Sequence, residues 1–151
     1  MLIAGARRWG LVVSLTRLVH FGEPDDELRR RHAAVTAVDA ALIRATRPGA
    51  AAGDVFRVGL AAYAEQGFPD EWTRHHQGGA TGYAGREYRA TPDTPHVVRD
   101  CQAFAWNPSI AGTKSEDTIL VTAEGAEVLT QTPDLPHLAA GGMARPDILV
   151  R

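Results

Sequence analysis

The sequence predicts an α+β fold, in which an antiparallel sheet carries helices on one face. Three observations lead to this fold class. Two apolar runs typical of strands open the chain, two long amphipathic segments follow, and from about residue 70 short apolar runs alternate with glycine and turn residues. Strands that precede and follow a block of helices, rather than alternating with them, are typical of α+β domains. A chain of 151 residues is long enough for one domain with a buried core.

The first third of the chain is predicted to form two strands and a long helix. Residues 2–4 and 11–21 are the strands, and the second is rich in β-branched residues and ends at a Gly-Glu-Pro turn. Asp25 and Asp26 place negative charge at a helix N-terminus, where the helix dipole favours it. We expect this helix to reach about Thr46, because an Arg-Pro-Gly sequence follows.

The remaining elements are a second helix and several short strands. Residues 54–66 have an apolar face at helical spacing and end before Gly-Phe-Pro. Residues 102–106 and 117–121 have the composition of buried strands, and the Glu-Gly pair at 124–125 indicates a hairpin turn. Residues 131–151 carry three prolines in a weak pattern, so we interpret them as a C-terminal extension.

Composition excludes several classes of function. The net charge of −2 gives no electrostatic reason to bind nucleic acid or an anionic membrane. No segment approaches the roughly 20 apolar residues of a membrane helix. Apolar residues precede the first charges, the wrong order for a signal peptide, and the single cysteine allows no internal disulfide. We therefore expect a cytoplasmic protein.

Several short motifs resemble the pita-bread family of aminopeptidase P, Xaa-Pro dipeptidase, methionine aminopeptidase and creatinase. Ser-Glu-Asp-Thr-Ile-Leu-Val-Thr at 115–122, then Glu-Val-Leu-Thr at 127–130, is similar to the family's closing strand pair. Leu-Thr-Arg at 15–17 and Gly-Glu-Pro at 22–24 resemble its Asp-x-Thr-Arg strand and its helix entry. The resemblance covers residues 1–130. It implies a partial pita-bread domain, with a curved antiparallel sheet, that is N-terminally incomplete.

Peptidases of this family hold two manganese, cobalt or zinc ions with two aspartates, one histidine and two glutamates. Carried over position by position, these ligands fall on Ile3, Ser14, His76, Asn107 and Glu116. Only the histidine and the last glutamate remain. Hard divalent cations need oxygen ligands, preferably anionic, and one carboxylate cannot balance two such ions. The comparison therefore implies no metal cofactor.

The resemblance also implies that six side chains converge on one concave face of the sheet: Ser14, His76, Tyr83, Asn107, Lys114 and Glu116. Tyr83 takes the place of a second family histidine that contacts substrate, and Lys114 takes the place of an arginine. We expect Glu116 beside His76 to raise the histidine's pKa. We also expect only one of the adjacent residues His75 and His76 to face the site, because neighbours on a strand point to opposite faces.

These residues leave three functions open. The first is metal-independent hydrolysis of a C–N bond, as in creatinase, on a small polar or peptide-like substrate. His76 would be the acid and base, Glu116 and Lys114 would bind the substrate with Tyr83 and Asn107, and a narrower version makes Ser14 a nucleophile. The second is a non-catalytic pseudoenzyme that binds a peptide or a partner protein. The third is a conventional two-metal aminopeptidase.

The resemblance has a further consequence for assembly. Without the family's first section, a sheet edge and apolar faces would lie uncovered, and such surfaces are usually covered by another chain. We therefore expect a homo-oligomer, or a domain completed by a second chain.

Overall fold

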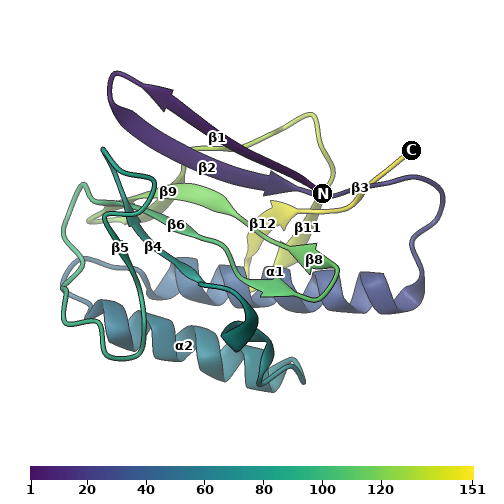
Figure 1. The fold of residues 1–151 in the computed structure, drawn as a ribbon, viewed down its shortest axis with the longest axis horizontal. Helices are drawn as coiled ribbons and strands as arrows, with labels where there is room; N and C mark the ends of the chain where they lie inside the picture. The colour runs from purple at the N-terminus through teal and green to yellow at the C-terminus, as the bar shows by residue number, and fades with distance from the viewer.

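The computed structural model describes residues 1–151 and contains a five-stranded antiparallel sheet with two helices packed below it (Figure 1). The strand order in this sheet is β10-β9-β6-β4-β5, and the other strands form two-stranded pairs. The helices are α1 Asp26–Ala45 and α2 Ala52–Glu65, with a 3₁₀ turn at Glu71–Arg74. The strands are β1 Leu2–Arg8, β2 Leu11–Arg17, β3 Val19–His20, β4 Gly78–Thr81, β5 Tyr88–Arg89, β6 Ala103–Trp106, β7 Ser109–Ile110, β8 Thr113–Lys114, β9 Asp117–Thr122, β10 Gly125–Val128, β11 His137–Ala140, β12 Met143–Pro146 and β13 Leu149–Val150. The α+β fold class is confirmed.

Helix α1 begins and ends close to the predicted residues. The Asp25 side chain caps its N-terminus by accepting a hydrogen bond from the Leu28 amide at 2.7 Å. At the other end the chain leaves the helix at Thr46 and turns at Gly49, where φ is +87°. The Asp25 cap and the turn after Thr46 lie at the two ends of the apolar periodicity, so these local signals together define the limits of α1.

The two helices pack tightly on each other and on the sheet. A Cβ atom added at Gly59 of α2 would lie 2.6 Å from the Leu42 side chain of α1, so any larger residue there would require Leu42 to move. Their inner faces meet the sheet in one apolar core. Its fully buried side chains include Val35, Val38, Leu42, Ile43, Val55, Tyr63, Phe104, Trp106, Ile119 and Val121.

The predicted strand over residues 11–21 is divided in two. Its first part, β2, pairs antiparallel with β1, and this hairpin lies on the side of the sheet away from the helices (Figure 1). Its second part, β3, pairs in parallel with β13 instead. The hairpin is joined to the sheet through β9, because the Ser14 amide donates to Thr118 Oγ1 at 2.8 Å and the Thr16 amide to the Glu116 carbonyl at 3.0 Å.

The outer strand of this hairpin is fully exposed to solvent. All seven residues of β1 are exposed, among them Leu2 and Ile3 at 61% and 64%. Exposed apolar strands are surfaces that other chains can cover. The expectation of a second chain stays a prediction.

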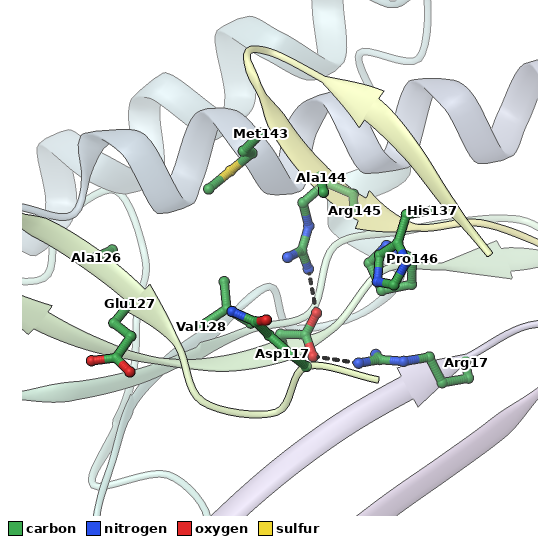
Figure 2. A pocket seen from close by; sticks show the side chains of 11 residues that line it. Arg17, Asp117, Ala126, Glu127, Val128, His137, Met143, Ala144, Arg145 and Pro146 are labelled. Carbon is green, nitrogen blue, oxygen red and sulfur yellow. Dashed lines mark hydrogen bonds and ion pairs between the residues drawn. The ribbon is translucent and has the colours of Figure 1, made fainter. Parts of the chain in front are cut away.

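The predicted C-terminal extension, residues 131–151, contains three strands that the sequence pattern did not indicate. Strands β11 and β12 form a hairpin, and Arg145 on β12 is 1% exposed. Its guanidinium donates to Asp39 on α1 at 2.6 Å and to Asp117 on β9 at 2.7 Å. Arg17 on β2 donates to the other oxygen of Asp117, also at 2.7 Å. Figure 2 shows Asp117 between the two arginines. This ion-pair network joins four parts of the chain.

The imidazole of His32 on α1 is a second buried polar link to the C-terminal hairpin. Its ring nitrogens lie 2.8 Å from Thr113 Oγ1 and 3.0 Å from the Pro146 carbonyl oxygen. Burial lowers the pKa of His32, against the opposing effects of the Pro146 carbonyl and Asp147.

The lowered pKa of His32 predicts that acid weakens the fold. Above about pH 6.5 the imidazole is neutral in both states, but at lower pH the unfolded chain takes up a proton that the folded protein does not. This difference removes up to about 1.4 kcal/mol of unfolding free energy per pH unit. Urea denaturation between pH 7.5 and pH 5 should therefore show a shallower pH dependence in His32→Gln than in the wild type. Equal slopes would contradict the assignment.

Neither helix combines the length and the apolar character that a membrane span requires.

Candidate functional site

A cavity of about 630 Å³ lies between the β1–β2 hairpin and the sheet. It brings together five of the six predicted site residues: Ser14, His76, Asn107, Lys114 and Glu116. Ile3, the remaining position carried over from the metal site, lines it too. The five positions onto which the resemblance carries the family's ligands therefore surround one space, although they are spread from residue 3 to residue 116.

The backbone accounts for this convergence. Glu116 faces the hairpin because it pairs with Thr16 in an isolated β-bridge. The Asn107 amide donates to the Gln77 carbonyl at 3.0 Å, which fixes the histidine segment beside the end of β6. Gly78 and Gly79 then let β4 approach its neighbours, since a Cβ on either would lie within 2.2 Å of a backbone oxygen.

Tyr83 does not join the other five residues. Its side chain is 73% exposed and packs against Gly10 at the turn of the β1–β2 hairpin. The Glu87 carboxylate accepts hydrogen bonds from the Tyr83 and Ala84 amides at 2.8 and 3.1 Å, which closes a small loop. This loop directs Tyr83 away from the cavity, so its expected place in the site is corrected.

The carboxylate of Glu116 is almost completely buried and already has three partners. Thr16 Oγ1 donates to Oε2 at 2.6 Å, Arg86 donates to Oε1 at 3.1 Å, and Lys114 Nζ lies 3.4 Å from Oε2. A carboxylate held in this way orients the two cations. It is therefore not a free base.

Both members of the histidine pair line the cavity, contrary to the expectation that only one would. Their rings stack with centroids 4.3 Å apart and planes at 27°. The alternation expected for a strand fails because His75 and His76 precede β4 and lie outside any regular strand. The Nδ1 atom of His76 is buried without a hydrogen-bond partner.

The expected rise in the pKa of His76 is also wrong. Burial lowers this pKa to about 4, and the positive charges of Arg89, Arg86 and Lys114 act in the same direction, as does His75. Burial, followed by Lys114, lowers the pKa of His75 as well. Both imidazoles are consequently neutral at pH 7.

Two arginines that the sequence analysis missed make the cavity cationic. Arg86 and Arg89 line it together with Lys114, whereas Glu116 is the one carboxylate of the lining. The one sequence feature that could have indicated them is that the two arginines lie three positions apart, directly after the glycine-rich segment. Arg86 lies in a loop and Arg89 in the two-residue strand β5, so no periodicity could predict which way the side chains point.

The residues at the carried-over ligand positions do not fit a pair of divalent metal ions. They comprise an isoleucine, two neutral polar side chains, a histidine, and a carboxylate that is engaged by Arg86 and Lys114. No group of three or more His, Cys, Asp or Glu side chains is arranged to hold a metal. Three cationic groups beside the same space oppose a cation.

Ser14, His76 and Glu116 line the same cavity but form no hydrogen bond with one another. Ser14 bonds to Thr118 through its backbone, and Glu116 bonds to Thr16 and Arg86. A nucleophilic serine needs a base within hydrogen-bond reach. The geometry therefore favours His76 acting on a water molecule over a Ser14 nucleophile.

A second cavity, of about 310 Å³, surrounds the buried ion-pair network and is drawn in Figure 2. Arg17 and Arg145 in its lining both pair with Asp117, and Glu127 lines it too. None of the predicted site residues lines it. We interpret this cavity as part of the packing between the sheet and the C-terminal hairpin.

Comparison with known sequences places these observations in a family. Residues 1–123 match the sequence profile of metallopeptidase family M24. An uncharacterized peptidase of Staphylococcus aureus strain MW2 is 32% identical over 122 residues, which cover 77% of this chain and 34% of the relative. The corresponding peptidase of the bovine strain RF122 / ET3-1 is 31% identical over the same length. The chain thus spans about a third of the length of these relatives.

Solved structures share the fold at lower sequence identity. A dipeptidase from Pyrococcus horikoshii OT3 superposes with a TM-score of 0.81 at 21% identity over 99% of this chain and 40% of its own. An X-Pro aminopeptidase from Thermotoga maritima MSB8 gives 0.80 at 20% identity, with the same coverage. The N-terminal domain of the FACT complex subunit SPT16 from chickpea, Cicer arietinum, gives 0.71 at 15% identity over 85% of this chain and 34% of its own.

Proposed function

The chain belongs to metallopeptidase family M24, and from this premise we propose that its cavity hydrolyses a C–N bond in a small polar or peptide-like substrate without a metal ion. The observation that carries the proposal is the cavity itself. The five positions that the resemblance assigns to the family's ligands line one open space, and the Nδ1 atom of His76 there is buried with no partner.

His76 supplies the acid–base chemistry in this proposal. With a pKa of about 4 it is neutral at pH 7, so it can take a proton from a water molecule. The water oxygen then attacks the carbon of the C–N bond. The imidazolium returns the proton to the departing nitrogen, which leaves as an amine, and the neutral histidine is restored.

The other residues of the cavity position the substrate and do not transfer protons. Glu116 holds Arg86 and Lys114 in place through its ion pairs. Asn107 is 2% exposed, and its Oδ1 has no partner, so it can accept a hydrogen bond from a substrate N–H group. Lys114 and Arg86 face the same space with positive charge that suits a polar, anionic group.

We expect the purified protein to bind no stoichiometric manganese, cobalt or zinc. The physical reason is that three cationic side chains and one ion-paired carboxylate surround the space that two divalent ions would need. Elemental analysis after purification without chelator gives the measurement. About two metal ions per chain, lost in Glu116→Gln, would contradict the prediction and favour a conventional two-metal aminopeptidase.

The hydrolase proposal is tested by turnover. Protein treated with a chelator and then freed of it is incubated with dipeptides, N-acyl amino acids and creatine, and released amine is quantified. We expect cleavage of at least one compound at a rate that added manganese does not raise. Activity that appears only with manganese would refute metal independence.

A second candidate function is non-catalytic binding of a peptide or protein partner. The observation that favours it is the ion pairing of Glu116, which leaves no carboxylate in the cavity free to act as a base. The N-terminal domain of a FACT complex subunit shares the fold, so this architecture is not confined to proteins named as peptidases. A peptide bound in the cavity with no turnover of any compound in the panel would favour this function.

A further inference from the structure

We propose that the outer edge of β1 binds an extended, acidic segment of another protein, which adds to the β1–β2 hairpin as a third strand and pairs its carboxylates with Arg7 and Arg8. This inference does not depend on the hydrolase proposal, because it concerns the outside of the hairpin and not the chemistry of the cavity. It gives a surface and a chemistry to the second chain that the sequence led us to expect.

The first argument is the free backbone of β1, the outermost strand of the molecule (Figure 1). Every second amide of β2 donates away from β1, to groups of the sheet and its adjoining loop: Val12, Ser14 and Thr16. In the hairpin register these residues stand opposite Arg7, Gly5 and Ile3. Directly opposite residues of an antiparallel pair either exchange their hydrogen bonds or both point away from each other. The N–H and C=O groups of Ile3, Gly5 and Arg7 therefore point outward, and they have no partner in the protein.

The second argument is the apolar character of the same edge. Ten large apolar side chains of the protein are exposed, and five of them lie within the first eleven residues: Met1, Leu2, Ile3, Trp9 and Leu11. Exposed apolar groups gathered in one place usually mark a surface that binds another molecule. When they lie on a strand with free backbone groups, the surface is a template for an added strand.

The third argument is charge, and it decides between possible partners. Residues 1–22 contain no aspartate or glutamate. Arg7 and Arg8 are both exposed, and neither is paired with a carboxylate: Arg7 donates to the Tyr83 carbonyl at 3.3 Å, and the Arg8 guanidinium lies 4.1 Å from the centre of the Trp9 ring. A second copy of β1 would bring two more arginines and no acid. Opposite charges across two strands are stabilising, so an acidic strand fits this edge better than a second copy does.

The order of residues along β1 specifies the order in the partner. The strand begins with Leu2 and Ile3 and ends with Arg7 and Arg8. A partner that continues the antiparallel pattern of the hairpin therefore carries its acidic residues first and β-branched apolar residues after them.

The binding test uses a capped and fluorescently labelled peptide with this order, Glu-Glu-Thr-Val-Thr-Val-Val, and a matched peptide with lysine in place of both glutamates. Fluorescence anisotropy at low ionic strength measures the two affinities. We expect the glutamate peptide to bind at least about tenfold more tightly, and added salt to reduce the difference.

Methylated peptides test whether the backbone pairs. With the first glutamate opposite Arg8, the amides of the two valines at the fourth and sixth positions donate to β1, and those of the two threonines point to solvent. N-methylation of those two valines should weaken binding at least about tenfold, whereas N-methylation of the two threonines should weaken it less than about threefold. Equal effects of the two methylations would refute strand addition.

Protein variants connect the charge preference to the two arginines. The double variant Arg7→Glu with Arg8→Glu should bind the lysine peptide more tightly than the glutamate peptide, which reverses the preference of the wild type. The matched control, Arg30→Glu with Arg57→Glu, makes the same change in net charge on the helices, which lie on the other face of the sheet (Figure 1). This control should keep the preference of the wild type. All four arginines are exposed, and thermal unfolding checks that both variants are folded.

Hydrogen exchange followed by NMR locates the peptide on the protein. The amides of residues 3, 5 and 7 should gain protection when the glutamate peptide is added, whereas those of residues 4, 6 and 8, which face β2, should change little. Three results would overturn the inference: no binding of the glutamate peptide, equal binding of the two charged peptides, or an unchanged preference in the Arg7 and Arg8 variant. Protection of residues 3, 5 and 7 in the protein alone, with a dimeric mass in light scattering, would assign the edge to a second copy instead.

Discussion

His76→Ala is expected to lower kcat/KM by about 10²–10⁴-fold on whichever compound the wild type cleaves, the range for loss of a general acid–base group. The reason is that Glu116 is bound to Arg86, Lys114 and Thr16, which leaves the imidazoles of His75 and His76 as the acid–base groups of the cavity, and His76 is the more buried of the two. His76→Gln, which keeps a polar side chain of similar size, should lose the same activity. His137→Ala, which removes an exposed histidine outside this cavity, is the matched control.

The pH profile of the wild type checks the same role independently. A base must be neutral to accept a proton, and the pKa of His76 is about 4. We therefore expect kcat/KM to stay level from neutral pH down to about pH 5 and to fall by half near pH 4. An acid limb near pH 6.5 in the wild-type profile would mean that the acting group is an unperturbed histidine.

For the variant His76→Ala, a fall in kcat/KM of less than about tenfold would refute the role given to His76.

Arg145→Met is expected to cause the largest loss of stability, about 3–5 kcal/mol of unfolding free energy, as for removal of one partner from a buried ion pair. Arg145 is 1% exposed and compensates both Asp39 and Asp117. Asp117 would keep Arg17, but Asp39 would keep only the hydroxyl of Ser115. A buried carboxylate with no counter-charge is the cause of the loss.

Urea denaturation of the purified chain measures this effect. The double variant Arg145→Met with Asp39→Asn should be more stable than Arg145→Met alone, because the uncompensated charge is removed. Arg57→Met serves as the control, since its partner Asp54 is exposed, and it should cost less than about 1 kcal/mol. Equal losses in Arg145→Met and Arg57→Met would show that the network does not stabilise the fold.

Local sequence signals predicted the helices well. The Asp25 cap, the apolar periodicity and the Arg-Pro-Gly stop together placed α1 to within about a residue, because helix formation depends on groups a few positions apart. The Glu-Gly turn likewise located the β9–β10 hairpin. The division of residues 11–21 at Leu18 was not predictable, since β2 and β3 pair with β1 and β13 at distant places in the chain.

The site was predictable only in part. The order of the family motifs brought Ser14, His76, Asn107, Lys114 and Glu116 together, as the cavity shows. The prediction for Tyr83 was wrong because it relied on sequence position alone. In the structure Tyr83 lies in a loop that Glu87 closes, and this loop directs the side chain away from the cavity.

The sequence by itself determined the fold class and the limits of the helices to within about two residues, and it predicted which residues come together in the cavity. The tertiary structure alone decided how those residues are charged and paired. Arg145 meets Asp39 across 106 positions and Asp117 across 28, and Arg86 meets Glu116 across 30. Such contacts depend on how the strands and helices pack, which no local pattern encodes. The pKa of His76 differs from the expected direction for the same reason: burial and three cations act on it through space.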